Sequence, residues 1–416
     1  MGRSRTIAST PSGWRGYVAQ LLINRNYALF LSGAFVSALG VWMQTVALGW
    51  LVLELSNSAF LLGLTSFMQM VPLFAFSLVG GAVADRVDRR RLLIITQGMS
   101  TISAALLALL TAIGLINIPI ILILALIGGI LNSFQWPTWQ VFIKDLVGPE
   151  QLRSAIAVNA ARVNLTRVLG PALGGFLLGS IGVAGCLAIG AVAMLGVQVS
   201  FWAIRLQQPA AKARSLSWLP VLWEGIAYGW RDRQVREVLL ATSALGILAM
   251  PYQAFLPAFA RDVLHVGEQG LGILLSSVGL GAVAGALGSG TRRVGRRPYL
   301  AMGALMCGTG LSLAVFALTD RPWLALPALA LVGLGSIGYM STANATIQLA
   351  VPDGLMGRIM GLWVMVNAGT MPIGSLAIGV VADRIGVQLA VAAGGILCAL
   401  LGASMAWRHN VTWERR

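Results

Sequence analysis

Charge is scarce in this sequence. Asp, Glu, Lys and Arg make up 10% of its 416 residues, whereas 57% are hydrophobic and the mean hydropathy is +0.81. About 25% of the residues of a typical soluble domain are charged, so the composition excludes a protein that meets water over most of its surface. A membrane protein of this length has room for about a dozen helices of ~20 apolar residues each.

Side chains for metal, redox or covalent chemistry are also few. The three cysteines, Cys186, Cys307 and Cys398, lie within apolar runs, and their spacing suits neither a disulfide framework nor a metal site. We expect them to pack as small hydrophobic residues. The two histidines, His265 and His409, fall near the ends of predicted helices. Because the sequence also contains no P-loop and no catalytic triad, we expect neither an enzyme nor a bound cofactor or metal.

Long stretches without Asp, Glu, Lys or Arg predict the membrane spans. The stretch 92–143 is long enough for two spans, and Asn117 and Pro119 mark a turn between them. The segment 179–182 divides another long stretch into two helices. The sequence therefore predicts an all-α membrane protein with twelve transmembrane helices. The uncharged stretches are 26–53, 55–84, 92–143, 168–204, 238–260, 269–291, 298–319, 322–352, 359–382 and 385–407.

Lysine and arginine are distributed unevenly between the two sides of these spans. If the N-terminus lies inside, 24 of the 29 fall in inner segments, three in outer segments and two within a span. Positive residues concentrate on the cytoplasmic side of membrane proteins, so we expect both termini in the cytoplasm. The net charge of +15 is thereby explained by topology, and nucleic acid is not expected as a partner.

The first half of the sequence resembles the second. The pattern of glycine and charge in Gly81–Arg90, between spans 2 and 3, recurs 207 residues later in Gly288–Arg297, between spans 8 and 9. A similar offset, 209 residues, takes Gln44 in span 1 to Gln253 in span 7. Such repeats predict two copies of one structural unit. We expect the two glutamines to face one another across the axis that relates the copies.

The repeat predicts the division of the chain. Residues 1–205 form an N-terminal six-helix half, residues 238–416 form a C-terminal half, and residues 206–237 form a cytoplasmic linker. Two parallel repeats are suited to alternating access, in which one half rocks against the other. The Trp and Leu residues of 216–238 suggest a helix on the inner membrane surface, and a plain solvated linker fits the same residues.

Three segments carry a resemblance to a known family. The segment GAVADRVDRR (81–90) is similar to the signature of the loop between helices 2 and 3 in the major facilitator superfamily. The segment RVLGPALGG (167–175) resembles the helix-5 motif of drug and solute exporters, with Thr166 in place of that motif's upstream glycine. Together with GRIMGLW (357–363), they make the chain similar over essentially its whole length to the bacterial branch containing siderophore exporters and macrolide efflux proteins.

The resemblance implies a function. We expect a monomeric secondary transporter of the bacterial inner membrane that exports small amphipathic molecules, drug-like or siderophore-like, by alternating access. The family also implies protons as the coupling ion. Two alternatives stay open from the sequence: an uptake transporter or lipid flippase of the same fold, and a non-transporting membrane receptor or scaffold.

The charged loop after helix 2 is expected to act as a cytoplasmic gate. Asp85 lies at the C-terminal end of that helix, where the helix dipole disfavours a carboxylate by ~0.3–1 kcal/mol. A positive partner must therefore compensate, and family resemblance points to the N-terminus of helix 11. The alternative is a loop that only fixes the membrane topology. Its arginines would be sufficient for that role, and Asp85 would not be required. The predicted gate residues are Gly81, Asp85, Arg86, Arg89, Arg90 and Arg358.

Ionisable residues inside the spans are the expected devices of ion coupling. Glu54 and Asp262, near the outer ends of helices 1 and 7, are coupling candidates together with Arg162 in helix 5. Arg167 lies about 140° around the same helix from Arg162 and is a candidate for the substrate cavity. For both arginines, structural support is the alternative, because Pro171 leaves a helical carbonyl without its donor.

Neutral polar and aromatic residues near the middle of the spans are candidates for a substrate cavity. The resemblance implies that helices 1, 4, 7 and 10 line it, and most of these residues belong to those helices. Packing between helices is the alternative for each of them. The candidates are Trp42, Gln44, Gln69, Asn132, Gln135, Trp136, Arg167, Tyr252, Gln253, Tyr339 and Asn367.

Overall fold

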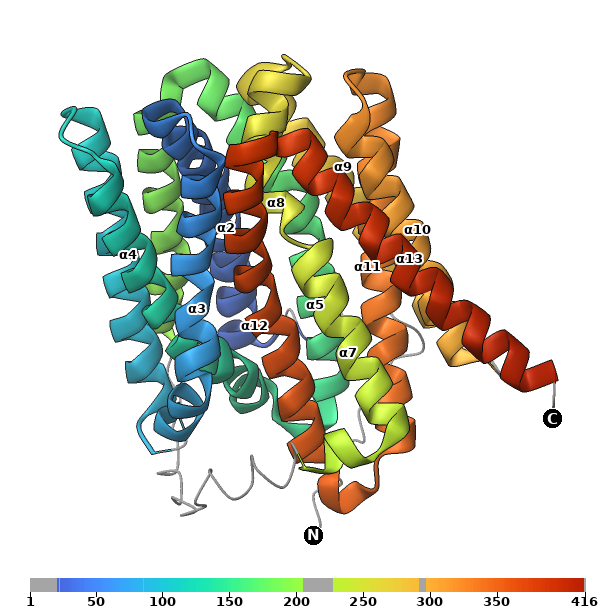
Figure 1. Cartoon of the computed structure of the whole chain (residues 1–416). Coiled ribbons are helices and arrows are strands. Elements are labelled where there is room, and N and C mark those ends of the chain that lie inside the picture. Colours follow the sequence, from blue (N-terminus) through green and yellow to red (C-terminus); the bar gives the residue numbers. More distant parts are fainter. Residues whose placement is uncertain (1–20, 22, 85, 205–226, 292–296, 415–416) are drawn as a thin grey trace, which may run out of the picture.

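A computed structural model describes residues 21, 23–84, 86–204, 227–291 and 297–414. The described residues form a bundle of long helices that run up and down (Figure 1). We call the side at which α2 begins and α13 ends the terminal side, and the side at which α2 ends and α13 begins the far side. The helices are α2 (Arg25–Ser56), α3 (Ala59–Ala84), α4 (Arg89–Ala112), α5 (Ile118–Ala203), α7 (Arg233–Leu248), α8 (Tyr252–Ala258), the π-helix η1 (Phe259–Val263), α9 (Gly267–Thr291), α10 (Pro298–Leu318), α11 (Pro322–Ala350), α12 (Asp353–Ile385) and α13 (Val387–Glu414).

Glycine divides the long helix α5 into three membrane spans. Gly148 and Gly182 both have φ 73° with ψ near 180°, a conformation that only glycine adopts without strain. Eleven described stretches are long and apolar enough to cross a membrane, and one of them, Glu150–Ala203, contains the break at Gly182. The described part of the chain therefore contains twelve membrane-spanning segments, which confirms the predicted fold of twelve transmembrane helices.

Short polar side chains fix where several helices begin. Asn24, Asp88, Asn117 and Asp232 each accept a hydrogen bond from a backbone N–H in the first turn of α2, α4, α5 and α7, respectively. Such caps satisfy the donors that a helix N-terminus leaves unpaired. They also explain why polar residues stand at the boundaries between the apolar runs.

The seventh span is interrupted in the middle of the membrane. The sequence predicts one continuous apolar helix over 238–260, but α7 ends at Leu248 and α8 begins at Tyr252. Pro251 has no N–H to continue the hydrogen-bond ladder, and it stands at the N-cap of α8. Irregular backbone at this depth is tolerated where it is buried in protein or lines a cavity.

The two halves meet along two pairs of helices, α3 with α12 and α5 with α9. Figure 1 shows α3 and α12 next to each other near the centre of the bundle. In the second pair, a Cβ added at Gly175 would lie 2.7 Å from the Cα of Gly272. The Ser276 hydroxyl of α9 also donates to the carbonyl oxygen of Val168, 2.8 Å away. Small residues allow this close approach of backbones within a membrane.

Candidate functional site

A cavity of about 330 Å³ lies between the two halves near the middle of the spans. The first half contributes one aromatic and one cationic side chain, and the second half contributes apolar, amide and hydroxyl groups. Small-molecule sites commonly have this composition, a mostly apolar wall with a few polar groups. Its lining residues are Trp42, Arg167, Met250, Gln253, Leu275, Val278, Ala282, Gly333, Ser336, Ile337, Met340 and Asn367.

The cavity owes its shape to two features of the local sequence. A Cβ added at Gly170 would lie 2.6 Å from the Trp42 side chain, so only glycine leaves room for this indole against α5. The break between α7 and α8 places Met250 and Gln253 at the cavity wall. The motif of 167–175 therefore serves packing as well as lining, because Gly174 lies against α2 and Gly175 against α9.

Among the described residues that line the cavity, Arg167 alone carries a charge. Its guanidinium forms neither a hydrogen bond nor an ion pair with any residue that the structure describes. An arginine at membrane depth normally finds a partner, because an isolated charge there is costly. Arg167 is thus available to an anion that enters the cavity.

Arg162, five residues earlier in the same helix, is fully engaged by the protein. Its Nη1 donates to the carbonyl oxygen of Ala34 at 2.8 Å and its Nε donates to Oδ1 of Asn159 at 3.1 Å. Its guanidinium carbon also lies 5.9 Å from the ring centroid of Trp139, within range of a cation–π contact. These contacts support the structural alternative for Arg162.

A second cavity, of about 450 Å³, continues from the first toward the terminal side. The two share Ile337 and Met340 in their walls. The remaining lining residues are Ser341, Asn344, Ala345, Gln348 and Trp363, and the first four follow the terminal-side half of α11. The indole nitrogen of Trp363 is buried and has no hydrogen-bond partner among the described residues. Among the described residues, the second cavity therefore lies between the central cavity and the terminal side.

Toward the far side the two halves are closed against each other. The Asp383 carboxylate of α12 accepts hydrogen bonds from the Ser58 hydroxyl and the Phe60 backbone N–H at the start of α3, at 2.9 and 3.0 Å. Arg261 donates from Nη1 to the carbonyl oxygen of Leu53 at the end of α2, at 3.1 Å. These contacts join segments more than 200 residues apart and hold the two halves together on the far side.

Toward the terminal side the same helices separate. Phe74 of α3 still packs on Gly369 of α12 near the middle of the bundle. Beyond it, no described atom lies within 4 Å of the position that a Cβ would take at Gly81, Gly357 or Gly361. Among the described residues, α3 and α12 thus make contact toward the far side and separate toward the terminal side.

Four of the predicted cavity residues, Trp42, Arg167, Gln253 and Asn367, line the central cavity. The prediction that Gln44 faces Gln253 across it is wrong. Gln44 donates from Nε2 to the carbonyl oxygen of Leu187, 2.6 Å away, and so points toward the third segment of α5. The repeat places the two glutamines at equivalent backbone positions, but their side chains have different neighbours.

The other predicted cavity residues lie elsewhere, and packing accounts for several of them. Gln135 donates to the Ser100 hydroxyl at 2.9 Å. The hydroxyl groups of Tyr339 and Thr242 lie 3.2 Å apart in the core of the second half, and Tyr252 is equally buried. Asn132, Trp136 and Gln69 belong to neither cavity lining, and Trp136 is 58% exposed.

The coupling candidates on the far side are not part of the cavity. Glu54 is exposed at the end of α2. Asp262 accepts hydrogen bonds from the adjacent Arg261 at 2.6 and 3.2 Å. Neither carboxylate lines the central cavity, whereas Arg167 does.

The predicted gate residues are partly described. Asp85 lies outside the described residues, Arg86 is exposed, and Arg358 lies in the early part of α12. Arg89 forms an ion pair with Asp145 at 3.0 Å, and Arg90 donates from Nε to the carbonyl oxygen of Phe201 at 2.7 Å. These two arginines thus join α4 to α5 within the first half, because their carboxylate and carbonyl partners both belong to α5.

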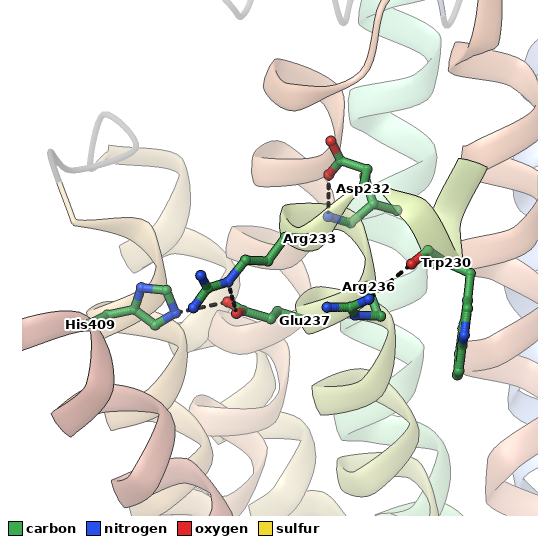
Figure 2. Close-up of polar contacts among 7 residues, drawn as sticks. Trp230, Asp232, Arg233, Arg236, Glu237 and His409 are labelled. Atoms are coloured by element: carbon green, nitrogen blue, oxygen red, sulfur yellow. Dashed lines mark hydrogen bonds and ion pairs between the residues drawn. The ribbon is translucent and has the colours of Figure 1, made fainter. Parts of the chain in front are cut away.

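A polar cluster on the terminal side joins the first and last helices of the second half. Glu237 of α7 lies between Arg233, at 3.0 Å, and the ring of His409 in α13, at 2.9 Å (Figure 2). Arg236 donates to the carbonyl oxygen of Trp230, 3.1 Å away. The predicted linker 206–237 thus already contains the start of α7, and its residues 206–226 lie outside the described part of the chain.

The sequence is similar to known transport proteins along most of its length. Residues 21–414 match the family described as "Transmembrane secretion effector". The staphyloferrin A transporter of Staphylococcus aureus is 25% identical over 366 residues, which cover 86% of this chain and 90% of that protein. The multidrug efflux pump Tap of Mycolicibacterium fortuitum is 26% identical, covering 90% and 93% of the two chains. The enterobactin exporter EntS of Shigella boydii is 27% identical, covering 85% and 84%.

Solved structures share the fold at lower sequence identity. The nucleoside transporter NupG superposes with a TM-score of 0.73 at 15% identity, covering 92% of this chain and 98% of that one. A bacterial homologue of the lysosomal transporter Spinster superposes with a TM-score of 0.71 at 14% identity, covering 98% and 99%. At these identities the likeness concerns the fold alone.

Proposed function

We propose that this chain, which belongs to the transmembrane secretion effector family of the major facilitator superfamily, exports small amphipathic anions across the bacterial inner membrane. The family makes it a multi-pass membrane transporter and not an enzyme. The observation that carries the proposal is the central cavity, which both halves line and which is followed toward the terminal side by a second cavity that shares two of its lining residues. A site between two repeats, open to one side at a time, is what alternating access requires.

The cavity lining supports the substrate class. Trp42 and the methionines offer an apolar, polarisable surface for a ring or chain. Gln253 and Asn367 offer amide hydrogen bonds. Arg167 adds an unpaired planar cation, which binds carboxylate, phosphate or sulfonate groups through two parallel N–H donors. An amphipathic anion can interact with all three kinds of lining group, apolar, amide and cationic.

The direction of transport is inferred from charge distribution and relatives. The excess of lysine and arginine in the segments on the terminal side supports a cytoplasmic location for that side. In the described conformation a substrate would then enter the cavity from the cytoplasm. The names of the Tap pump and of the enterobactin exporter EntS support release to the outside. We propose protons as the coupling ion and a monomer as the transporting unit.

Energised inside-out vesicles test the proposal directly. Vesicles that contain the protein should accumulate the anionic dye carboxyfluorescein when a proton gradient is imposed, and a protonophore should abolish the accumulation. The matched control is vesicles with an equal amount of the Arg167→Gln protein. Accumulation in right-side-out vesicles only would overturn export in favour of uptake. Failure of every tested anion and cation to move would favour a receptor or scaffold.

Comparison of secreted metabolites would then identify the natural substrate. Deletion of the gene should remove or reduce an anionic, partly apolar compound in the culture medium, and the wild-type gene should restore it. A gene that encodes Arg167→Gln at the same abundance should restore less. If the deletion strain secretes an unchanged set of compounds and gains no drug sensitivity, export under those conditions is excluded.

A further inference from the structure

The second cavity differs in chemistry from the central one. Its residues on α11 recur every three or four positions, at Ser341, Asn344, Ala345 and Gln348, and so share one face of that helix. Hydroxyl and amide groups dominate this face, and none of the described lining residues carries a charge. The central cavity, by contrast, has the cation of Arg167 in its wall. The second cavity is thus suited to an uncharged polar group.

The amide groups on this face are only partly used by the protein. Gln348 donates from Nε2 to Oδ1 of Asn344, and this bond holds the two side chains together. Nδ2 of Asn344 and Oε1 of Gln348 have no partner among the described residues. The pair therefore presents one free donor and one free acceptor close together. An amide group, which carries an N–H and a carbonyl oxygen, complements this pattern.

Trp363 of α12 adds an aromatic side chain to the wall of the second cavity. Its indole nitrogen is buried and has no hydrogen-bond partner among the described residues. A buried donor without a partner is costly, and native structures keep few of them. The nitrogen is covered in the described conformation, so the indole has to turn about its side-chain bonds before a ligand can reach it. A ligand with a carbonyl oxygen would then supply the acceptor that this N–H lacks.

Two apolar residues, Ile337 and Met340, belong to the walls of both cavities. Nδ2 of Asn367, in the central cavity, donates to Sδ of Met340 at 2.8 Å. The unbranched thioether of methionine adapts its shape to what lies against it. Between Gly333 in the central cavity and Gln348 in the second, α11 rises about 22 Å. The two cavities together therefore suit an elongated ligand that passes Met340.

We propose that the second cavity is a binding subsite for an uncharged, amide-bearing arm of the exported anion, whose charged end binds Arg167. The Asn344–Gln348 pair exchanges hydrogen bonds with one amide group of the arm, and the Trp363 N–H turns to donate to a carbonyl oxygen. The substrate class narrows to elongated anions with an acidic group at one end and amide groups along an uncharged chain. The inference rests on the proposed function, because it assigns the anionic end to the central cavity of the exporter.

Calorimetric titration of the full-length protein in nanodiscs tests the subsite with two anions of different length. Dansylglycine carries its carboxylate one residue from the dansyl ring. Dansyltriglycine has two more uncharged amide units, each of which extends the chain by up to ~3.3–3.6 Å. We call the dissociation constant of the short probe divided by that of the long probe the length preference. We expect the wild-type protein to bind the long probe about 3- to 30-fold more tightly.

Trp363→Phe removes the indole N–H and keeps an aromatic ring. We expect the length preference to fall about 2- to 10-fold, the effect of one neutral hydrogen bond. Thermal stability should not fall, because the N–H has no described partner to lose. Asn344→Leu should also lower the length preference. Trp323→Phe is the matched control and should leave it unchanged, because Trp323 lies at the far-side end of α11 and lines neither cavity.

Arg167→Gln distinguishes failure of the subsite from failure of the proposed function. It should weaken both probes by a similar factor and keep the length preference. If it weakens neither probe while Trp363→Phe still lowers the length preference, the subsite stands and anion recognition in the central cavity falls. Equal affinity of the wild-type protein for both probes, or an unchanged length preference in Trp363→Phe, would overturn the subsite. If Trp363→Phe fails to fold, Asn344→Leu decides by the same criterion.

Discussion

Arg162 donates a hydrogen bond from Nη1 to the carbonyl oxygen of Ala34, 2.8 Å away, and so ties the second segment of α5 to α2. We predict that Arg162→Gln lowers the free energy of unfolding by about 1–3 kcal/mol, because it removes a charge-assisted hydrogen bond between α5 and α2. Thermal unfolding followed by intrinsic fluorescence measures this change. Wild-type stability in Arg162→Gln would contradict the structural role.

Arg167→Gln should have the opposite profile. The guanidinium has no described partner, so the protein should fold with at least the stability of the wild type. Loss of one charge-assisted interaction, ~1.5–3 kcal/mol, should raise the apparent KM for carboxyfluorescein about tenfold or more. Transport of a cationic dye such as ethidium, measured in the same vesicles, should not fall. An equal loss for both dyes would refute anion recognition by Arg167.

Gly175→Ala should disfavour the far-side-closed conformation. The new Cβ would stand 2.7 Å from the Cα of Gly272, so the helices α5 and α9 could no longer pack as they do. We expect faster labelling of a far-side cysteine that is protected in the wild type. Gly361→Ala is the matched control, because its Cβ meets no described atom within 4 Å and should leave the labelling rate unchanged.

Cysteine substitution at the two repeat-related glutamines should give different results. Gln253→Cys should react with a permeant thiol reagent, and bound substrate should slow the reaction, because Gln253 lines the cavity. Gln44→Cys should lower thermal stability instead, because its amide bonds to the Leu187 carbonyl. The test uses a background in which the three native cysteines are replaced. Equal substrate protection at both positions would contradict the described geometry.

Sequence patterns predicted the spans well because lipid exposure demands long uncharged segments, and only glycine or proline interrupts them. The break at 249–251 escaped that reasoning, because nothing in an apolar run distinguishes a Pro that bends a helix from one that ends it. The surroundings of individual side chains were harder to predict from the sequence. Gln44 and Gln253 are equivalent in the repeat, yet Gln44 bonds to a backbone carbonyl and Gln253 lines the cavity. Equivalent backbone positions in the two halves do not have the same neighbours.

Part of the candidate site left no signal in the sequence. The apolar lining residues Leu275, Val278 and Ile337 look like any other residue of a membrane helix, and only their packing gives them a role. Asp383 did leave a signal, since its Val-Ala-Asp-Arg repeats the segment that ends at Arg86. The Asp145 partner of Arg89 could not be foreseen, because it depends on how α4 packs against α5.

The neutral wall of the 450 Å³ cavity has a kinetic consequence. None of its described lining residues carries a charge, whereas lysine and arginine are concentrated in the segments on the terminal side. Charged entrances speed association by focusing the electric field, and the gain disappears at high ionic strength. The rate at which an anion reaches this entrance should therefore fall as the salt concentration rises, because salt screens the basic segments of this side. Binding at Arg167, which lies deeper in the protein, should depend much less on salt.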